Sequence, residues 1–212
     1  MGLITYLANK LGGLLTPAEV DGNFAELDTR TRLGWRDNIV PFDVEVGNPN
    51  APVLNIVRGN IKRYTFFPGE LTEASASWHI DHDYALGTKL FLHVHWVCPT
   101  TDIGTVRWGF EYSVAKGHQQ QAFPETTTVY VEQATNGTPY MHYVGEVSEA
   151  NAIDGLALDI EPDTIILVRC FRDGLHPNDT LDAGVFGVCL DLHYQADKLT
   201  TPQKAPDFFV GG

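Results

Sequence analysis

The stretch Val106 to Val114, VRWGFEYSV, decides the fold class of this chain. Apolar or aromatic side chains alternate with polar residues or glycine, so that one face carries Val106, Trp108, Phe110, Tyr112 and Val114, and the other carries Arg107, Gly109, Glu111 and Ser113. Successive side chains of a β-strand point to opposite faces. The alternation therefore predicts a strand with one face in a core and the other toward water. Trp108, and by the same pattern Trp96, are expected inside the protein.

Short segments of this kind follow one another along most of the chain, separated by Gly, Pro, Asn and Asp. We predict strands near residues 43–46, 53–57, 61–66, 75–80, 88–97, 106–114, 126–132, 140–147, 164–172 and 183–194. No helical periodicity comes between them. Many short strands at near-regular spacing predict a mainly β protein, an antiparallel β-sandwich of jelly-roll type.

The two ends of the chain differ from this pattern. We expect residues 1–38 to form an N-terminal helical segment for attachment or oligomerisation, residues 39–197 the jelly-roll-like sandwich, and residues 198–212 an extended C-terminal arm. The arm carries two aromatic residues, Phe208 and Phe209, which either fray with the terminus or dock on a neighbour.

The N-terminal segment contains the signals of a short helix. Thr16-Pro17-Ala18-Glu19 has the form of a capping box, and the residues on one face of the helix that follows it are Val20, Phe24, Leu27 and Thr31. Isolated helices of this length are marginal in water, and the stripe is narrow. We therefore expect this helix to dock on the sandwich or on copies of itself.

Composition limits the possible partners. The chain has 212 residues, with 14 Lys and Arg against 27 Asp and Glu, so its formal net charge is −13. This charge repels a phosphate backbone, and nucleic-acid binding is not expected. No run of about 18 apolar residues occurs, so membrane insertion is not expected either. The three cysteines have no C-x-x-C spacing, and we expect them to be reduced and mostly buried.

His93 and His95 are the candidate metal ligands. They lie on one face of a predicted strand, and with Gly87 they form G-x5-H-x-H, which resembles the opening of the metal motif of cupins. That motif also requires a Glu four or five residues after the second His, and Pro99 and Thr100 stand there instead.

A third ligand from another strand is an open alternative, with Glu111 or His193 as the candidates. The preferred interpretation is that His93 and His95 lie on the half-exposed face of a strand, where they bond to neighbours such as Glu111 or meet symmetry copies. On that interpretation no metal and no cofactor is expected. The chain also lacks a nucleophile elbow, a phosphate-binding loop and H-E-x-x-H, so we assign no catalytic residue and do not expect an enzyme.

Several segments resemble proteins of tailed bacteriophages. The N-terminal LTPAEVDGNFAELDTR is similar to the L-T-x-A-E-x-D-x-N-F segment that opens many tail-fibre and other virion proteins. HVHW (93–96), RWGFEY (107–112), FPETTTVY (123–130), RCFRD (169–173) and DLHY (191–194) are similar to a widespread set of phage structural proteins. The resemblance implies a β-sandwich of jelly-roll type, usually a trimer, mounted on the particle, and it implies no catalytic residues.

The expected function is thus a structural component of a tailed-phage virion, assembled in the host cytoplasm. A trimeric tail-associated fibre, spike or adaptor is preferred, with itself, other virion proteins and a host surface receptor as partners. Two alternatives stay open: a decoration protein on the phage head, and a cupin-like metal-dependent enzyme that uses His93 and His95.

Overall fold

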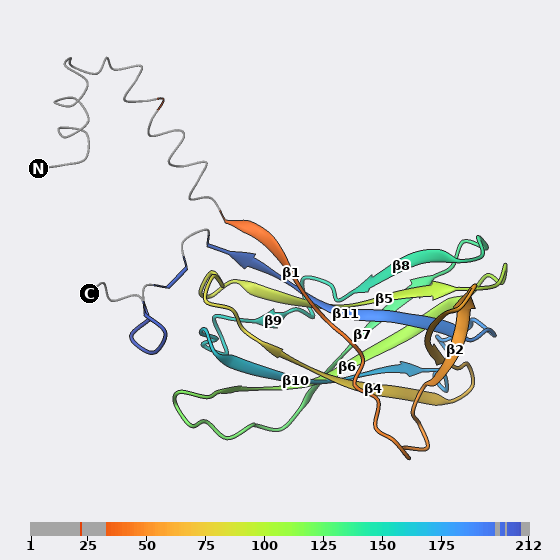
Figure 1. Cartoon of the computed structure of the whole chain (residues 1–212), viewed down its shortest axis with the longest axis horizontal. Helices are drawn as coiled ribbons and strands as arrows, with labels where there is room; N and C mark the ends of the chain where they lie inside the picture. Colours follow the sequence, from red (N-terminus) through yellow and green to blue (C-terminus); the bar gives the residue numbers. More distant parts are fainter. Residues whose placement is uncertain (1–21, 23–32, 198–199, 202, 209–212) are drawn as a thin grey trace, which may run out of the picture.

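The chain forms two antiparallel β-sheets packed face to face (Figure 1). This computed structural model describes residues 22, 33–197, 200, 201 and 203–208. It confirms the prediction of a mainly β, antiparallel, jelly-roll-like sandwich. The predicted N-terminal helix, including Thr16, Val20, Phe24, Leu27 and Thr31, lies outside the described residues, and so does Phe209.

The larger sheet, sheet A, contains seven strands. Its main path runs β2 (Val53–Arg58), β3 (Ile61–Phe66), β11 (Val185–Ala196), β5 (Lys89–Cys98) and β8 (Met141–Glu146). β1 (Gly34–Val40) pairs with β11, and β9 (Ile153–Asp154) pairs with β5. The smaller sheet, sheet B, has the order β4 (Leu71–His79), β10 (Thr164–Asp173), β6 (Thr105–Lys116) and β7 (Thr127–Ala134).

The core lies between the two sheets, and tryptophans form its centre. Trp96 of β5 and Trp108 of β6 are completely buried, with ring centroids 6.2 Å apart, as the alternation predicts. Trp78 of β4 is buried as well, and its indole N–H donates a hydrogen bond to the carbonyl oxygen of Asn38 at 2.7 Å. Cys98 and Cys170 are also buried, and all three cysteines are free thiols, which confirms that prediction.

Two local predictions differ from the structure. The predicted strand at 43–46 is wrong, because only Asp43 forms an isolated bridge, to Ser75, and the chain then turns at Gly47, whose φ is +91°. Conversely, GWRDNIV forms β1, which begins at Gly34, before the predicted domain boundary at residue 39. Buried and exposed residues do not alternate in β1, because most residues on both faces of this strand are exposed. The sandwich therefore includes residues assigned above to the N-terminal segment.

The C-terminal arm returns to its own sandwich at Phe208. This side chain is buried, and its ring stands edge-on to those of His82 and His118, with centroids 5.6 and 5.7 Å away. The amide of Thr201 donates to the carbonyl oxygen of His82 at 3.1 Å. The expectation of an arm extended onto a neighbour is thus corrected for Phe208, because apolar packing within the chain buries its ring.

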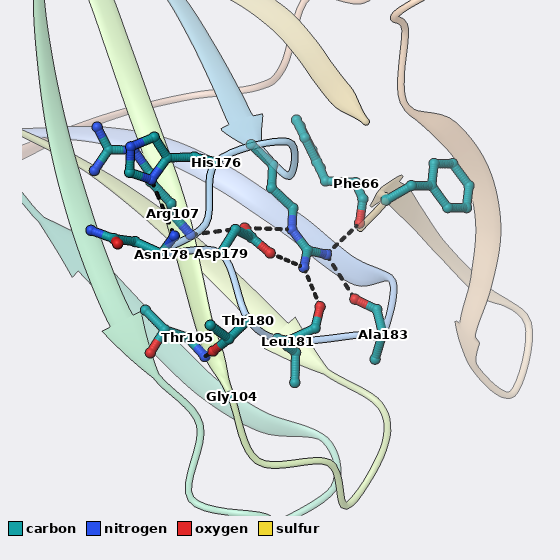
Figure 2. A network of polar contacts seen from close by, with 12 residues as sticks. Phe66, Gly104, Thr105, Arg107, His176, Asn178, Asp179, Thr180, Leu181 and Ala183 are labelled. Carbon is teal, nitrogen blue, oxygen red and sulfur yellow. Dashed lines mark hydrogen bonds and ion pairs between the residues drawn. The ribbon is translucent and has the colours of Figure 1, made fainter. Parts of the chain in front are cut away.

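The connection from β10 to β11 is anchored by a buried arginine, Arg172. Its guanidinium lies among Asp179, Leu181, Ala183 and Phe66 and donates hydrogen bonds to all four (Figure 2). This network fixes the end of the sandwich at which β11 begins. Within the part of the chain that the structure describes, no helix has the length and apolar character needed to cross a membrane.

Candidate functional site

Histidines and carboxylates gather on the outer face of sheet A, the face turned away from sheet B. We call this group the histidine cluster, and its members are Asp37 (β1), His93 and His95 (β5), His142 and Glu146 (β8), and Asp191 and His193 (β11). The strand register brings them together: Asp191 pairs with His93, His93 with Glu146, and Asp37 with His193. Directly opposed residues on one face of an antiparallel pair lie close enough to interact.

Three ligand-type atoms meet at the centre of the cluster. The Nε2 atom of His93 lies 3.0 Å from Nε2 of His95 and 3.3 Å from Oδ2 of Asp191. The same carboxylate oxygen lies 3.6 Å from Nε2 of His95. His93 is 0% exposed and Asp191 is 2% exposed, so water is excluded from two of the three groups.

Burial controls the charge of these groups. The pKa of His93 is lowered to about 4, mainly by burial, and the neighbouring His193 and His95 contribute to this lowering. Burial also lowers the pKa of His95, with a second contribution from His142. The pKa of Asp191 is raised, mainly because its carboxylate is buried. His93 is therefore a neutral imidazole near neutral pH, with one nitrogen free of a proton.

Hydrogen bonds at the edge of the cluster hold its members in place. Nδ1 of His95 lies 2.8 Å from Nε2 of His142, and the backbone N–H of Leu192 donates to Oδ1 of Asp191 at 2.7 Å. His193 sits between two carboxylates, with Nε2 against Asp37 and Nδ1 against Glu146. Both nitrogens of His193 donate at once only when the ring is protonated.

A shallow hollow lies beside the cluster. It is lined by Trp35, Phe91, Glu146 and His193. The ring of Trp35 stands edge-on to that of Phe91, with centroids 5.7 Å apart, yet Trp35 remains 62% exposed. The exposed ring of Trp35 therefore lies on the same hollow as two ionisable members of the cluster, Glu146 and His193.

The structure thus brings some predicted residues together and separates others. His93 and His95 share a face as predicted, and His193 lies beside them, with its ring centroid 4.0 Å from that of His93. Glu111 belongs to sheet B, where it accepts hydrogen bonds from Arg169 and Thr126, so it is wrong as a third ligand. The expectation that His93 is half-exposed is also wrong, because residues of β8 and β11 cover it.

Sequence reasoning missed four members of the cluster: Asp37, His142, Glu146 and Asp191. One signal was available for Asp191, since D-x-H in DLHY has the same two-residue spacing as H-x-H and places Asp191 and His193 on one face. Its use required knowledge that β11 pairs with β5. The other three residues lie on two further strands, Asp37 on β1 and His142 and Glu146 on β8, and nothing in their local sequence distinguishes them.

Comparison with known proteins finds distant structural similarity. No protein-family model and no curated protein matches the chain. A carbohydrate-binding module specific for non-crystalline cellulose, CBM28, aligns with a TM-score of 0.31 and 11% identity, over 77% of this chain and 86% of the module. Dimeric latent PorU from Porphyromonas gingivalis aligns with a TM-score of 0.28 and 8% identity, over 77% of this chain and 13% of PorU. At these TM-scores neither likeness assigns a function.

Proposed function

We propose that the chain is a structural component of a tailed-phage virion, a homotrimeric tail-associated fibre, spike or adaptor that serves attachment or assembly. The observation that carries this proposal is the surface of the β2–β3 hairpin at the edge of sheet A. Four apolar residues of this hairpin are at least half exposed: Val53, Leu54, Ile56 and Ile61. Apolar side chains gathered in this way on an edge hairpin are typical of a surface that another chain covers.

The first strand supports the same interpretation. The phage-like N-terminal segment leads directly into β1, on which Trp35 and Ile39 are each 62% exposed. β1 and β3 pair with successive parts of β11, so both lie along the edge of sheet A opposite β5. β1 and the β2–β3 hairpin, both with exposed apolar side chains, thus share one side of the sandwich, and the predicted attachment segment precedes β1 in the sequence.

In this proposal each part of the chain has a role in assembly. The segment containing Thr16, Val20, Phe24, Leu27 and Thr31 docks on copies of the chain or on other virion proteins. The sandwich presents its remaining surface outward, where a host surface receptor is the expected partner. The net charge of −13 does not favour binding to the packaged nucleic acid.

Purified particles of the phage that encodes the chain provide the test. Mass spectrometry of the particles is expected to detect the protein, and electron microscopy with a specific antibody is expected to place it on the tail. A location on the head would instead support the decoration alternative. Absence of the protein from intact particles would contradict a virion role.

A further inference from the structure

We propose that His93, His95 and Asp191 bind a divalent first-row transition-metal ion, such as Zn²⁺, on the outer face of sheet A. The ligand atoms are Nε2 of each histidine and Oδ2 of the aspartate. This site goes beyond the proposed virion role and does not depend on it, because it uses side chains of a single chain and the pairing of β5 with β11.

The geometry of the three atoms fits a metal ion. Metal–ligand distances of ~2.0–2.1 Å in tetrahedral geometry place neighbouring ligand atoms ~3.3 Å apart. The three separations in the cluster are 3.0, 3.3 and 3.6 Å. Each ligand atom therefore lies close to the position that a shared ion requires, with only small side-chain adjustments.

An unpartnered nitrogen of His93 gives an independent reason for the ion. Nδ1 of this completely buried ring has no hydrogen-bond partner, and the nearest carboxylate oxygen, Oε2 of Glu146, is 3.7 Å away. A proton on Nδ1 faces that carboxylate favourably. A proton on Nε2 would point toward Oδ2 of Asp191 at 3.3 Å, but it would leave a bare, buried lone pair at Nδ1 facing the charge of Glu146. With the proton on Nδ1, the lone pair of Nε2 is directed toward His95 and Asp191.

The other two ligands are oriented in the same way. When Nδ1 of His95 donates to Nε2 of His142, Nε2 of His95 carries no proton and presents its lone pair. Oδ1 of Asp191 accepts the N–H of Leu192, which leaves Oδ2 for the centre of the cluster. Hydrogen bonds of this kind to the second atom of a ligand are typical of metal sites. In these tautomers three lone pairs converge in a buried place, where they repel one another unless a cation lies between them.

The ligand set selects the class of metal. Two imidazoles with one carboxylate suit Zn²⁺, Co²⁺ or Ni²⁺, whereas Mg²⁺ and Ca²⁺ prefer sets made of oxygen atoms. The side chain of His95 is 20% exposed, while those of His93 and Asp191 are 0% and 3% exposed. Entry of the ion, and a fourth ligand such as water, are therefore expected on the His95 side.

The competing arrangement is a set of hydrogen bonds with no ion. In it, the proton of one Nε2 is shared between His93 and His95, at their separation of 3.0 Å. The test starts from the full-length protein, from which metal is removed with a chelator before zinc chloride is added. The metal site predicts that one zinc ion then binds per chain, detected by native mass spectrometry and by titration calorimetry, whereas the hydrogen-bonded arrangement predicts that none binds.

Two ligand variants and one control make this test specific. His95→Ala and Asp191→Asn are expected to weaken zinc affinity at least about tenfold, since loss of even an outer partner has that effect. His118→Ala is the matched control, because His118 lies after β6 and bonds Asp163, outside the histidine cluster. It is expected to bind zinc as the wild type does. Magnesium is expected to compete with zinc in none of these proteins.

Two outcomes would overturn the site. One is a wild-type protein that binds no zinc. The other is zinc binding that neither ligand variant weakens, which would indicate an adventitious ion only. A measurement on the wild-type protein keeps the test valid even if a variant fails to fold. Zinc is expected to shift the imidazole NMR signals of His93 and His95 and to leave that of His118 unchanged. Equal shifts at all three rings, or none, would also exclude the site.

Discussion

The carboxylate of Asp179 accepts two hydrogen bonds from the guanidinium of Arg172, with Nε to Oδ2 at 3.0 Å and Nη2 to Oδ1 at 2.7 Å. Both side chains are almost completely buried. The remaining N–H groups of the arginine donate to three carbonyl oxygens, those of Phe66, Leu181 and Ala183 (Figure 2). All five donors of the guanidinium are thus satisfied, as a buried arginine requires.

This pair leads to a prediction about stability. Arg172→Met leaves the Asp179 carboxylate buried without its partner, and we expect the free energy of unfolding to fall by about 3–5 kcal/mol in chemical denaturation. Lys89→Met is the control, because the ion pair of Lys89 with Glu149 is exposed, and such pairs contribute about 0–1 kcal/mol. A similar loss of unfolding free energy in the two variants would show that the buried Arg172–Asp179 pair contributes no more to stability than an exposed pair does.

A second arginine links the acid stability of the protein to two carboxylates on the outer face of sheet B. Arg169 bonds Glu73 at 2.5 Å and Glu111 at 2.7 Å. Burial alone would raise the pKa of Glu73, but hydrogen bonds from Asn48 and Arg169, with the charge of Arg169, outweigh it and lower that pKa. Hydrogen bonds from Thr126 and Arg169 lower the pKa of Glu111.

The sign of the pH dependence follows from these shifts. A carboxyl group whose pKa is lower in the folded state stabilises the fold above its unfolded pKa, 4.5 here, and that stability is lost as the pH falls through the folded pKa. Between about pH 5 and pH 3, the unfolding free energy of the wild type is therefore expected to fall more steeply than that of the Glu73→Gln, Glu111→Gln double variant. If the unfolding free energies of the two proteins fell in parallel with pH, Glu73 and Glu111 would not be the source of the acid dependence.

The docking of the C-terminal segment depends on Phe208. Phe208→Ala removes the ring that packs on His82 and His118, so we expect residues 200, 201 and 203–208 to detach while the sandwich stays folded. The amide of Thr201, which donates to His82, is then expected to lose protection in hydrogen exchange. Leu175→Ala is the control, because Leu175 is highly exposed elsewhere on the chain. Unchanged protection of Thr201 in Phe208→Ala would mean that other contacts hold the segment.

The sequence predicts the sandwich better than it predicts the histidine cluster, for a physical reason. Alternation in VRWGFEYSV is a local consequence of one buried face, and so β6 and the burial of Trp108 follow from it. β1 lacks that signal because it is an edge strand whose residues are all exposed or half-buried. Asp191 joins His93 only through the register of β11 on β5, which is a long-range property. Local sequence therefore shows H-x-H but not what completes it.

Native mass spectrometry of the full-length chain tests most directly whether it is an assembly subunit. We predict a species near 70 kDa, three times the chain mass of 23.4 kDa. Ile56→Glu places a charge on the exposed β2–β3 hairpin and is expected to dissociate this species into monomers. Ile103→Glu, at an exposed isoleucine outside the hairpin, is expected to leave it intact. A wild-type chain found only as a monomer, or a trimer that Ile56→Glu does not weaken, would contradict assembly through this surface.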